Sequence, residues 1–287
     1  MVASEDSHEK PDGHDEGLQH DLMAVLSRRR ALNLLMSLGA VPFIAACDGP
    51  AMSQPEQDRS AMGPDGAVCV KHPEETAGPF PADGSNRAHG TLANVLEHSG
   101  IVREDMRSSL GNAASVAEGV VFDLEITLQD VSSACAPLAG YAVYLWHCDA
   151  AGQYSIYNVK AESYLRAVGV TDDQGRLKFR TIFPGCYRGR YPHMHFEVYP
   201  NLQAATDYRN RLLTSQLAMP AEECRQVYAS VASYRESVAA FEKVSLERDG
   251  IFRDNTPAQL TAQTPVIDGD VRSGFKGRVT IGLAARA

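Results

Sequence analysis

The middle of the chain alternates hydrophobic and polar residues. After Val120, apolar residues occupy every second position, at Phe122, Leu124 and Ile126, as a half-buried strand requires. Further short apolar runs between Gly and Asp clusters predict strands at residues 141–148, 167–171, 177–182, 193–199, 212–218, 259–266 and 275–283. Many short strands joined by turns are typical of a sandwich. We therefore expect a mainly β protein, built as an antiparallel β-sandwich.

Other segments lack this alternation. Residues 68–117 are irregular and carry turn signals, which predicts a long N-terminal arm wrapped over the domain. Residues 220–244 have apolar positions at helical spacing and predict one helical excursion. Residues 48–67 are rich in Gly, Pro, Ser and Gln and predict a flexible linker. The folded domain should therefore span residues 68–287.

The N-terminal 47 residues resemble an export signal. Arg28-Arg29-Arg30 is followed by an apolar run over residues 31–46, too short for a membrane span, which resembles a twin-arginine signal. The run ends in Ile44-Ala45-Ala46-Cys47, which resembles a lipobox and makes Cys47 a candidate lipid anchor. We expect an exported protein, anchored to the membrane or otherwise extracytoplasmic. An ordinary buried helix is the alternative.

The net charge and the cysteines limit which ligands and partner molecules the protein can bind. A net charge of -9 and a pI near 5.5 exclude a nucleic-acid-binding surface, which needs clustered Lys and Arg. The six cysteines suit an oxidising compartment, and the absence of a Cys-x-x-Cys pair argues against a zinc site. Lipidation of Cys47 would leave an odd number, so at least one cysteine would be unpaired. Connectivity, including a Cys186 to Cys224 pair, stays open, as does the oligomeric state.

Two histidines supply the first candidate chemistry. His193 and His195 are two residues apart on a predicted strand, so their imidazoles lie on the same face and Met194 lies on the opposite, core face. Two neutral imidazoles side by side can bind a metal. Such a pair is also common on the exposed surface of a strand. Taken alone, it does not decide between these readings.

Two tyrosines strengthen the metal hypothesis. Tyr154 closes a Trp-x-x-Asp-x-x-Gly-x-Tyr stretch that begins at Trp146, and Tyr187 closes Arg-Thr-Ile-Phe-Pro-Gly-Cys-Tyr, six residues before His193. With the Arg190 to Phe196 segment, these motifs resemble the intradiol ring-cleavage dioxygenases, the family of catechol and protocatechuate dioxygenases. The resemblance covers roughly residues 70–220.

The resemblance implies a non-haem Fe(III) site. Its ligands would be Tyr154, Tyr187, His193 and His195, with Tyr187 released as a catechol chelates the metal. Phenolates suit this hard cation, and two tyrosinates with one hydroxide balance its charge. The implied reaction cleaves a catechol-type diol with O2, between its two hydroxyl-bearing carbons, to a cis,cis-muconate.

The same resemblance implies roles for further residues. Arg190 would stabilise charge that develops on the substrate, and Gln216 matches a family glutamine near the ligands. Arg190 could instead be a surface salt-bridge partner. The stretch Thr76-Ala77-Gly78-Pro79-Phe80 resembles the family's substrate-side segment, with Phe80 in place of the usual Tyr, which leaves the choice of catechol open. Two alternatives to an enzyme also stay open: a membrane-tethered metal-binding lipoprotein, and a lipoprotein that binds aromatic compounds or carbohydrate.

Overall fold

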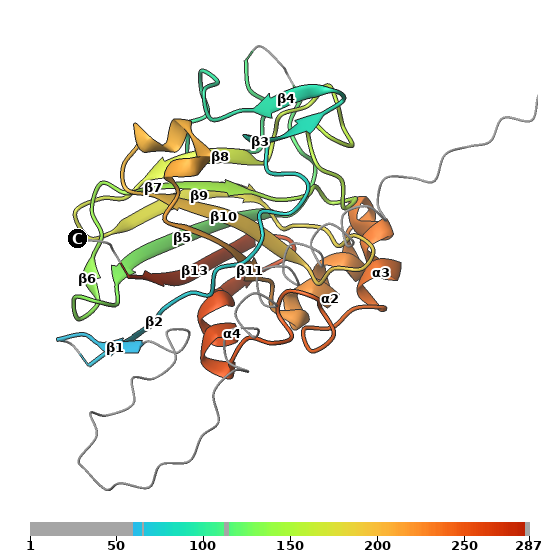
Figure 1. The fold of residues 1–287 in the computed structure, drawn as a ribbon. Helices are drawn as coiled ribbons and strands as arrows, with labels where there is room; N and C mark the ends of the chain where they lie inside the picture. Colours follow the sequence, from blue (N-terminus) through green and yellow to red (C-terminus); the bar gives the residue numbers. More distant parts are fainter. Residues whose placement is uncertain (1–59, 65, 112–114, 285–287) are drawn as a thin grey trace, which may run out of the picture.

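Two β-sheets form the body of the protein (Figure 1). The structure is a computed structural model that describes residues 60–64, 66–111 and 115–284. The predicted export signal, with Cys47, and most of the predicted linker lie outside the described residues. Among the residues described, no helix has the length and apolar character needed to cross a membrane.

Each sheet is assembled from strands distant in sequence. The smaller has the order β11-β10-β7-β8, and in the larger, ordered β12-β13-β5-β6, strand β9 also pairs with β5. Their bounds are β5 Val121–Asp130, β6 Ala136–Pro137, β7 Ala142–Trp146, β8 Arg166–Val170, β9 Arg176–Ile182, β10 His193–Tyr199, β11 Leu213–Ala218, β12 Val266–Asp270 and β13 Gly274–Leu283. The predicted β-sandwich is therefore confirmed, with strand bounds close to those expected for most strands.

The core lies between the sheets. Alternate residues of β5 are buried in the main cluster, together with Met194, Phe196 and Val198 of β10. Because side chains alternate along a strand, His193 and His195 leave the other face of β10. This face carries the candidate site. Met194 is fully buried, as the alternation predicts.

One pairing differs from a purely antiparallel sandwich. β13 runs parallel to β5, with Phe275 opposite Phe122 and Leu283 opposite Asp130. A parallel pair requires a long connection, which here includes all the strands and helices between the two. The hydrophobic alternation of each strand predicts which face is buried, but it carries no information on strand direction.

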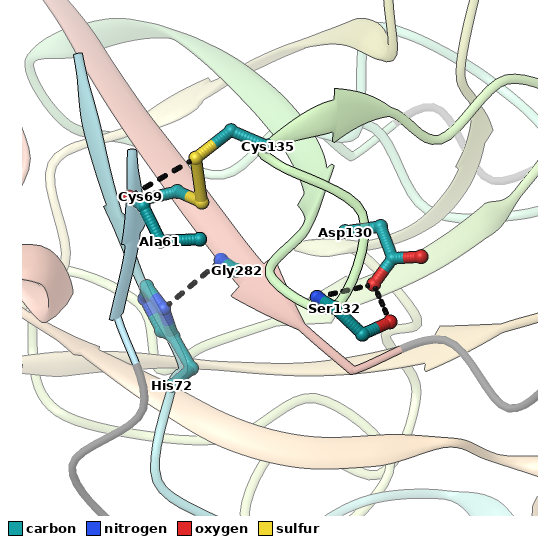
Figure 2. Close-up of a disulfide and its surroundings, with 7 residues drawn as sticks. All are labelled: Ala61, Cys69, His72, Asp130, Ser132, Cys135 and Gly282. Carbon is teal, nitrogen blue, oxygen red and sulfur yellow. Dashed lines mark hydrogen bonds between the residues drawn. A yellow bond between two sulfur atoms is a disulfide. The ribbon is translucent and has the colours of Figure 1, made fainter. Parts of the chain in front are cut away.

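The arm is more regular than its sequence indicates. β1 Ser60–Met62 pairs with β2 Val68–Val70, and β3 Asp83–Ala88 pairs with β4 Thr91–Asn94. β1 lies inside the segment predicted to be a linker. Figure 2 shows how the start of the arm is fixed: Cys69 of β2 forms a disulfide with Cys135, and the backbone N–H of Gly282 donates to Nδ1 of His72.

The helical segments differ in part from prediction. Residues 220–244 hold two helices, α2 Ala221–Ser230 and α3 Arg235–Phe241, interrupted where Val231 is extended. The strand expected at residues 259–266 is wrong, because helix α4 Pro257–Gln263 precedes a shorter β12. Thr256 and Gln259 form a capping box at its start with Pro257 at the first helical position, and this local preference for helix outweighs the apolar alternation. Short 3-10 turns occupy Ala204–Thr206, Tyr208–Asn210 and Ala232–Tyr234.

Candidate metal centre

The four predicted ligands lie together. Nε2 of His193 is 3.1 Å from Nε2 of His195 and 3.1 Å from the phenol oxygen of Tyr187. The Tyr154 ring lies 5.8 Å from that of Tyr187 and 6.3 Å from that of His195, centroid to centroid. Residues separated by up to 41 positions therefore present two ring nitrogens and two phenols to one region.

Close packing of two loops brings the tyrosines together. A Cβ at Gly185 would lie 2.4 Å from the Asp149 carbonyl oxygen, so the loop before Tyr187 contacts the turn before Tyr154 at backbone distance. Gly152, at φ +80°, faces the other loop in the same way. Ser237 of α3 links the two loops, because its hydroxyl accepts from the Cys186 N–H at 2.8 Å and donates to the Ala150 carbonyl at 2.9 Å. The glycines of both tyrosine motifs are thus required by this contact.

The turn before Tyr154 has its own support. The Asp149 carboxylate accepts from the backbone N–H groups of Ala151 at 3.0 Å and Gln153 at 2.9 Å. The backbone N–H of Tyr154 donates to Asn158 at 2.9 Å. The aspartate in the Trp-x-x-Asp motif therefore shapes the turn that delivers Tyr154.

His193 is held in a defined tautomer. Its Nδ1 lies 2.5 Å from the Tyr191 carbonyl, which can only accept, so Nδ1 carries the proton and Nε2 presents a lone pair. Burial, with the nearby Arg190 charge, lowers the pKa of His193 well below its ordinary value. Burial and the neighbouring His193 do the same to the pKa of His195. Both imidazoles are therefore neutral and suited to bind a metal.

The two tyrosine side chains differ in how far they are buried. Tyr154 is 1 % exposed, and its phenol oxygen makes no hydrogen bond of regular geometry among the described residues, although it lies next to Tyr187. Burial and then Tyr187 raise the pKa of Tyr154 well above its ordinary value. Tyr187 is only partly buried, the one ligand candidate of the four that reaches the surface. Tyr187 is thus the candidate ligand nearest to solvent.

These donors fit a hard, highly charged cation. A buried phenol with no partner is costly to an isolated protein, and a cation that replaces its proton would remove that cost. The two lone-pair nitrogens complete a mixed oxygen and nitrogen set. The described residues contain no group of three or more His, Cys, Asp and Glu side chains suited to a metal, so the two tyrosines are essential to this set.

Arg190 lies beside the ligands and is fixed on two sides. Its Nε donates to Asp249 at 3.1 Å, and its Nη2 donates to the Gln216 side-chain oxygen at 2.7 Å. Gln216 is opposite His195 in the β10–β11 pairing, and its Nε2 donates to the Thr76 carbonyl at 2.9 Å. The structure thus brings Arg190 and Gln216 together at the site. Arg190 is buried rather than the surface residue of the alternative reading.

The sequence did not point to Asp249. This buried carboxylate accepts from Arg190 and from the backbone N–H of Tyr191 at 2.7 Å, so it fixes the segment that leads into β10. Asp249 is distant in sequence from the motifs and lies in no regular element. Its neighbour Gly250 signals only a turn.

Aromatic rings cover the ligands. Phe80, from the arm, lies 4.8 Å from the Tyr154 ring and 5.1 Å from the Tyr157 ring. Trp146 stacks on the His195 ring. The segment beginning at Thr76 is therefore near the ligands, as the resemblance implies, and Phe80 brings a ring without a hydroxyl.

The chain is similar in sequence and fold to known dioxygenases. Residues 118–209 match a family model described as Dioxygenase, and all four candidate ligands and Arg190 fall within that match. An intradiol ring-cleavage dioxygenase from Tetranychus urticae is 21% identical, covers 76% of this chain and 96% of its own, and superposes with a TM-score of 0.56. The dioxygenase domain of a carbohydrate-binding fusion protein from a Streptomyces species is 19% identical over 75% of this chain and 99% of its own, with a TM-score of 0.46. No curated protein sequence matches the chain.

Residues 118–209 match a dioxygenase family model, and the fold is that of the intradiol ring-cleavage dioxygenases. The resemblance predicted from the motifs is confirmed at this level.

Proposed function

We propose that this protein is a non-haem Fe(III) dioxygenase that uses O2 to cleave a catechol-type diol between its hydroxyl-bearing carbons, giving a cis,cis-muconate. The unpartnered phenol of Tyr154, buried beside two facing imidazole nitrogens, is the observation that carries the proposal. Buried polar groups in folded proteins are nearly always hydrogen-bonded, so a buried phenol without a regular hydrogen bond indicates a missing ligand. The dioxygenase family match and the intradiol fold support the same assignment.

The residues divide into stable and exchangeable ligands. Tyr154, His193 and His195 are buried and fixed by packing, so they would remain bound throughout. Tyr187 is partly exposed on a loop and would be the ligand that substrate displaces. When bound, Fe(III) supplies the Lewis-acid centre that holds the catecholate and activates it toward O2. Departure of both the hydroxide and the Tyr187 phenolate as a catecholate dianion enters would keep the charge of the site balanced.

Arg190 would act on the substrate rather than on the metal. Its guanidinium is permanently charged, buried, and oriented by Asp249 and Gln216. A fixed donor that is itself buried stabilises negative charge as it develops, without reorganisation. Gln216 and Asp249 are then positioning residues for Arg190.

We further propose that the protein acts outside the cytoplasm. The Cys69–Cys135 disulfide supports this location, because such bonds persist in oxidising compartments. The twin-arginine-like segment and the Cys47 lipobox support export and a lipid anchor. Labelling with a radioactive fatty acid, lost in Cys47→Ser, would test the anchor.

Iron analysis with a visible spectrum tests the catalytic proposal. The purified protein should hold iron and show tyrosinate-to-iron charge-transfer colour, and catechol under air should yield muconate absorbance. Tyr187→Phe should retain some iron with an altered colour, whereas His195→Ala should lose metal. One equivalent of copper or zinc with no iron and no turnover would favour the metal-binding lipoprotein. An iron-free protein that binds catechol or carbohydrate without turnover would favour the third reading.

A further inference from the structure

The two candidate histidine ligands are oriented by different means. His193 has a hydrogen bond from Nδ1 to the Tyr191 carbonyl. Nδ1 of His195 is buried and makes no hydrogen bond within the described residues. The nearby Thr76 carbonyl, which raises the pKa of His195, accepts a hydrogen bond from Gln216 at 2.9 Å and forms none of regular geometry with Nδ1. Metal-bound histidines nearly always donate their second nitrogen to a fixed acceptor, which sets the ring plane. His195 needs another source of orientation.

Trp146 supplies a flat surface at that position. Its ring lies 5.0 Å from the His195 ring, centroid to centroid, with only 5° between the two planes. The pairing of β7 with β10 places these residues opposite each other, so strand register fixes the contact. Cross-strand neighbours on one face are close enough for their rings to touch.

The rings behind Trp146 are themselves held. Tyr144, two residues earlier on the same face of β7, stacks on Trp146 at 4.8 Å. Its hydroxyl donates to the Pro81 carbonyl at 2.7 Å and accepts from Arg166 at 3.0 Å. Arg166 is buried and also donates to the Phe80 and Pro81 carbonyls. The stack therefore ends on a network that has little freedom to move.

We infer that Trp146 is a positioning residue that fixes the ring plane of His195 by stacking, where Nδ1 lacks the well-formed hydrogen bond that holds His193. The inference rests on the proposed role of His195 as a metal ligand, but not on the identity of the metal or on turnover. A ligand ring that is free to rotate about its side-chain bonds aims its lone pair less often at the metal. Loss of the stack should therefore weaken metal binding and broaden the range of metal geometries.

The test compares three variants in the metal-free protein. Trp146→Leu removes the flat surface, Trp146→Phe keeps a smaller ring, and Phe196→Leu is the matched control. Phe196 is as fully buried and adjoins His195 in sequence, but it lies on the core face of β10. Affinity for Fe(III) and, separately, for Zn(II) should fall about 10-fold to 100-fold in Trp146→Leu, the loss typical when a residue supporting a metal ligand is removed. Trp146→Phe should lose less, and Phe196→Leu should bind as the wild type does.

Two spectroscopic readouts separate positioning from a general loss of stability. The iron-loaded Trp146→Leu protein should give a broader electron paramagnetic resonance signal than the wild type, whereas a merely destabilised protein would not. Trp146 is the only tryptophan of the chain, so Zn(II) binding should shift the emission of the wild-type protein directly. Wild-type affinity and signal in a folded Trp146→Leu protein, or equal losses in Phe196→Leu, would overturn the inference.

The experiments distinguish failure of the Trp146 inference from failure of the proposed function. A wild-type protein that binds Zn(II) with a Trp146-dependent affinity but has no iron and no dioxygenase activity would reject the proposed function and keep the role of Trp146. Iron binding and muconate formation that survive unchanged in Trp146→Leu would reject the role and keep the function.

Discussion

Tyr154 offers a test in which one substitution should stabilise the metal-free protein and abolish the site. Its phenol oxygen is buried next to Tyr187 but makes no hydrogen bond of regular geometry in the described structure, so folding desolvates it without recovering a full hydrogen bond. Tyr154→Phe removes only that oxygen and keeps the ring contacts with Phe80 and Tyr187. The free energy of unfolding of the metal-free protein should therefore rise by about 1–3 kcal/mol. For a domain of this size, that raises the melting temperature by about 2–10 °C.

Tyr234→Phe is the matched control. Tyr234 is equally buried, but its hydroxyl accepts from the Val120 N–H at 3.1 Å and donates to the Phe183 carbonyl at 2.7 Å. Removal of this hydroxyl leaves two backbone groups unsatisfied and should lower the free energy of unfolding by about 1–3 kcal/mol. The same Tyr→Phe substitution should thus raise the free energy of unfolding at position 154 and lower it at position 234.

Calorimetry and urea unfolding, with and without iron, measure this effect. Iron binding stabilises the wild type in proportion to its affinity and should leave Tyr154→Phe nearly unchanged, so the order of stability should reverse when iron is added. A metal-free Tyr154→Phe protein that is destabilised as much as Tyr234→Phe would refute the reasoning.

Three further perturbations concern the supports of the site and fold. Asp249→Asn removes the charge that pairs with buried Arg190, so stability should fall by about 3 kcal/mol and kcat should fall more than KM changes, as urea unfolding and steady-state kinetics would show. Burial lowers the pKa of His72 from 6.5 to about 4. The unfolded state therefore binds more protons than the folded state between these pH values. As the pH falls from 6.5 to 5, the free energy of unfolding of the wild type should decrease by about 2 kcal/mol through this group. Urea unfolding at both pH values should show no such decrease in His72→Asn. Cys69→Ser with Cys135→Ser opens a link across 66 residues and should cost about 4 kcal/mol, measured against the wild type without reductant; a cost unchanged when reductant is added to both proteins would contradict this origin.

The sequence predicts most of the sheet structure because each strand carries its own signal. The β10 prediction, residues 193–199, coincides with the observed strand, since its boundaries are marked by a proline and by a polar turn. The strand predicted at 259–266 failed, although Thr256, Pro257 and Gln259 together form a helix start that could have been read. The parallel direction of β13 against β5 could not be read, since direction depends on the whole path of the chain.

The site was predictable where its residues lie in local motifs. Each candidate ligand has sequence neighbours that help to position it. The glycines before Tyr154 and Tyr187, for example, allow the two loops to pack closely. Asp249 has no such neighbours, because its partnership with Arg190 joins segments 59 residues apart and is created only by folding. Buried charge pairs of this kind carry no periodicity. The role of Trp146 depends in the same way on the register of β7 against β10.

The parallel β5–β13 pair also bears on how the protein reaches its native state. The two strands are about 150 residues apart in sequence, so β5 emerges from the ribosome long before its neighbour exists, and one of its edges stays open during most of synthesis. An unpaired hydrophobic strand edge is where chains associate wrongly. Yield in the cell should therefore depend on chaperones that cover β5, and ribosome-stalled chains that end before Gly274 should aggregate once released.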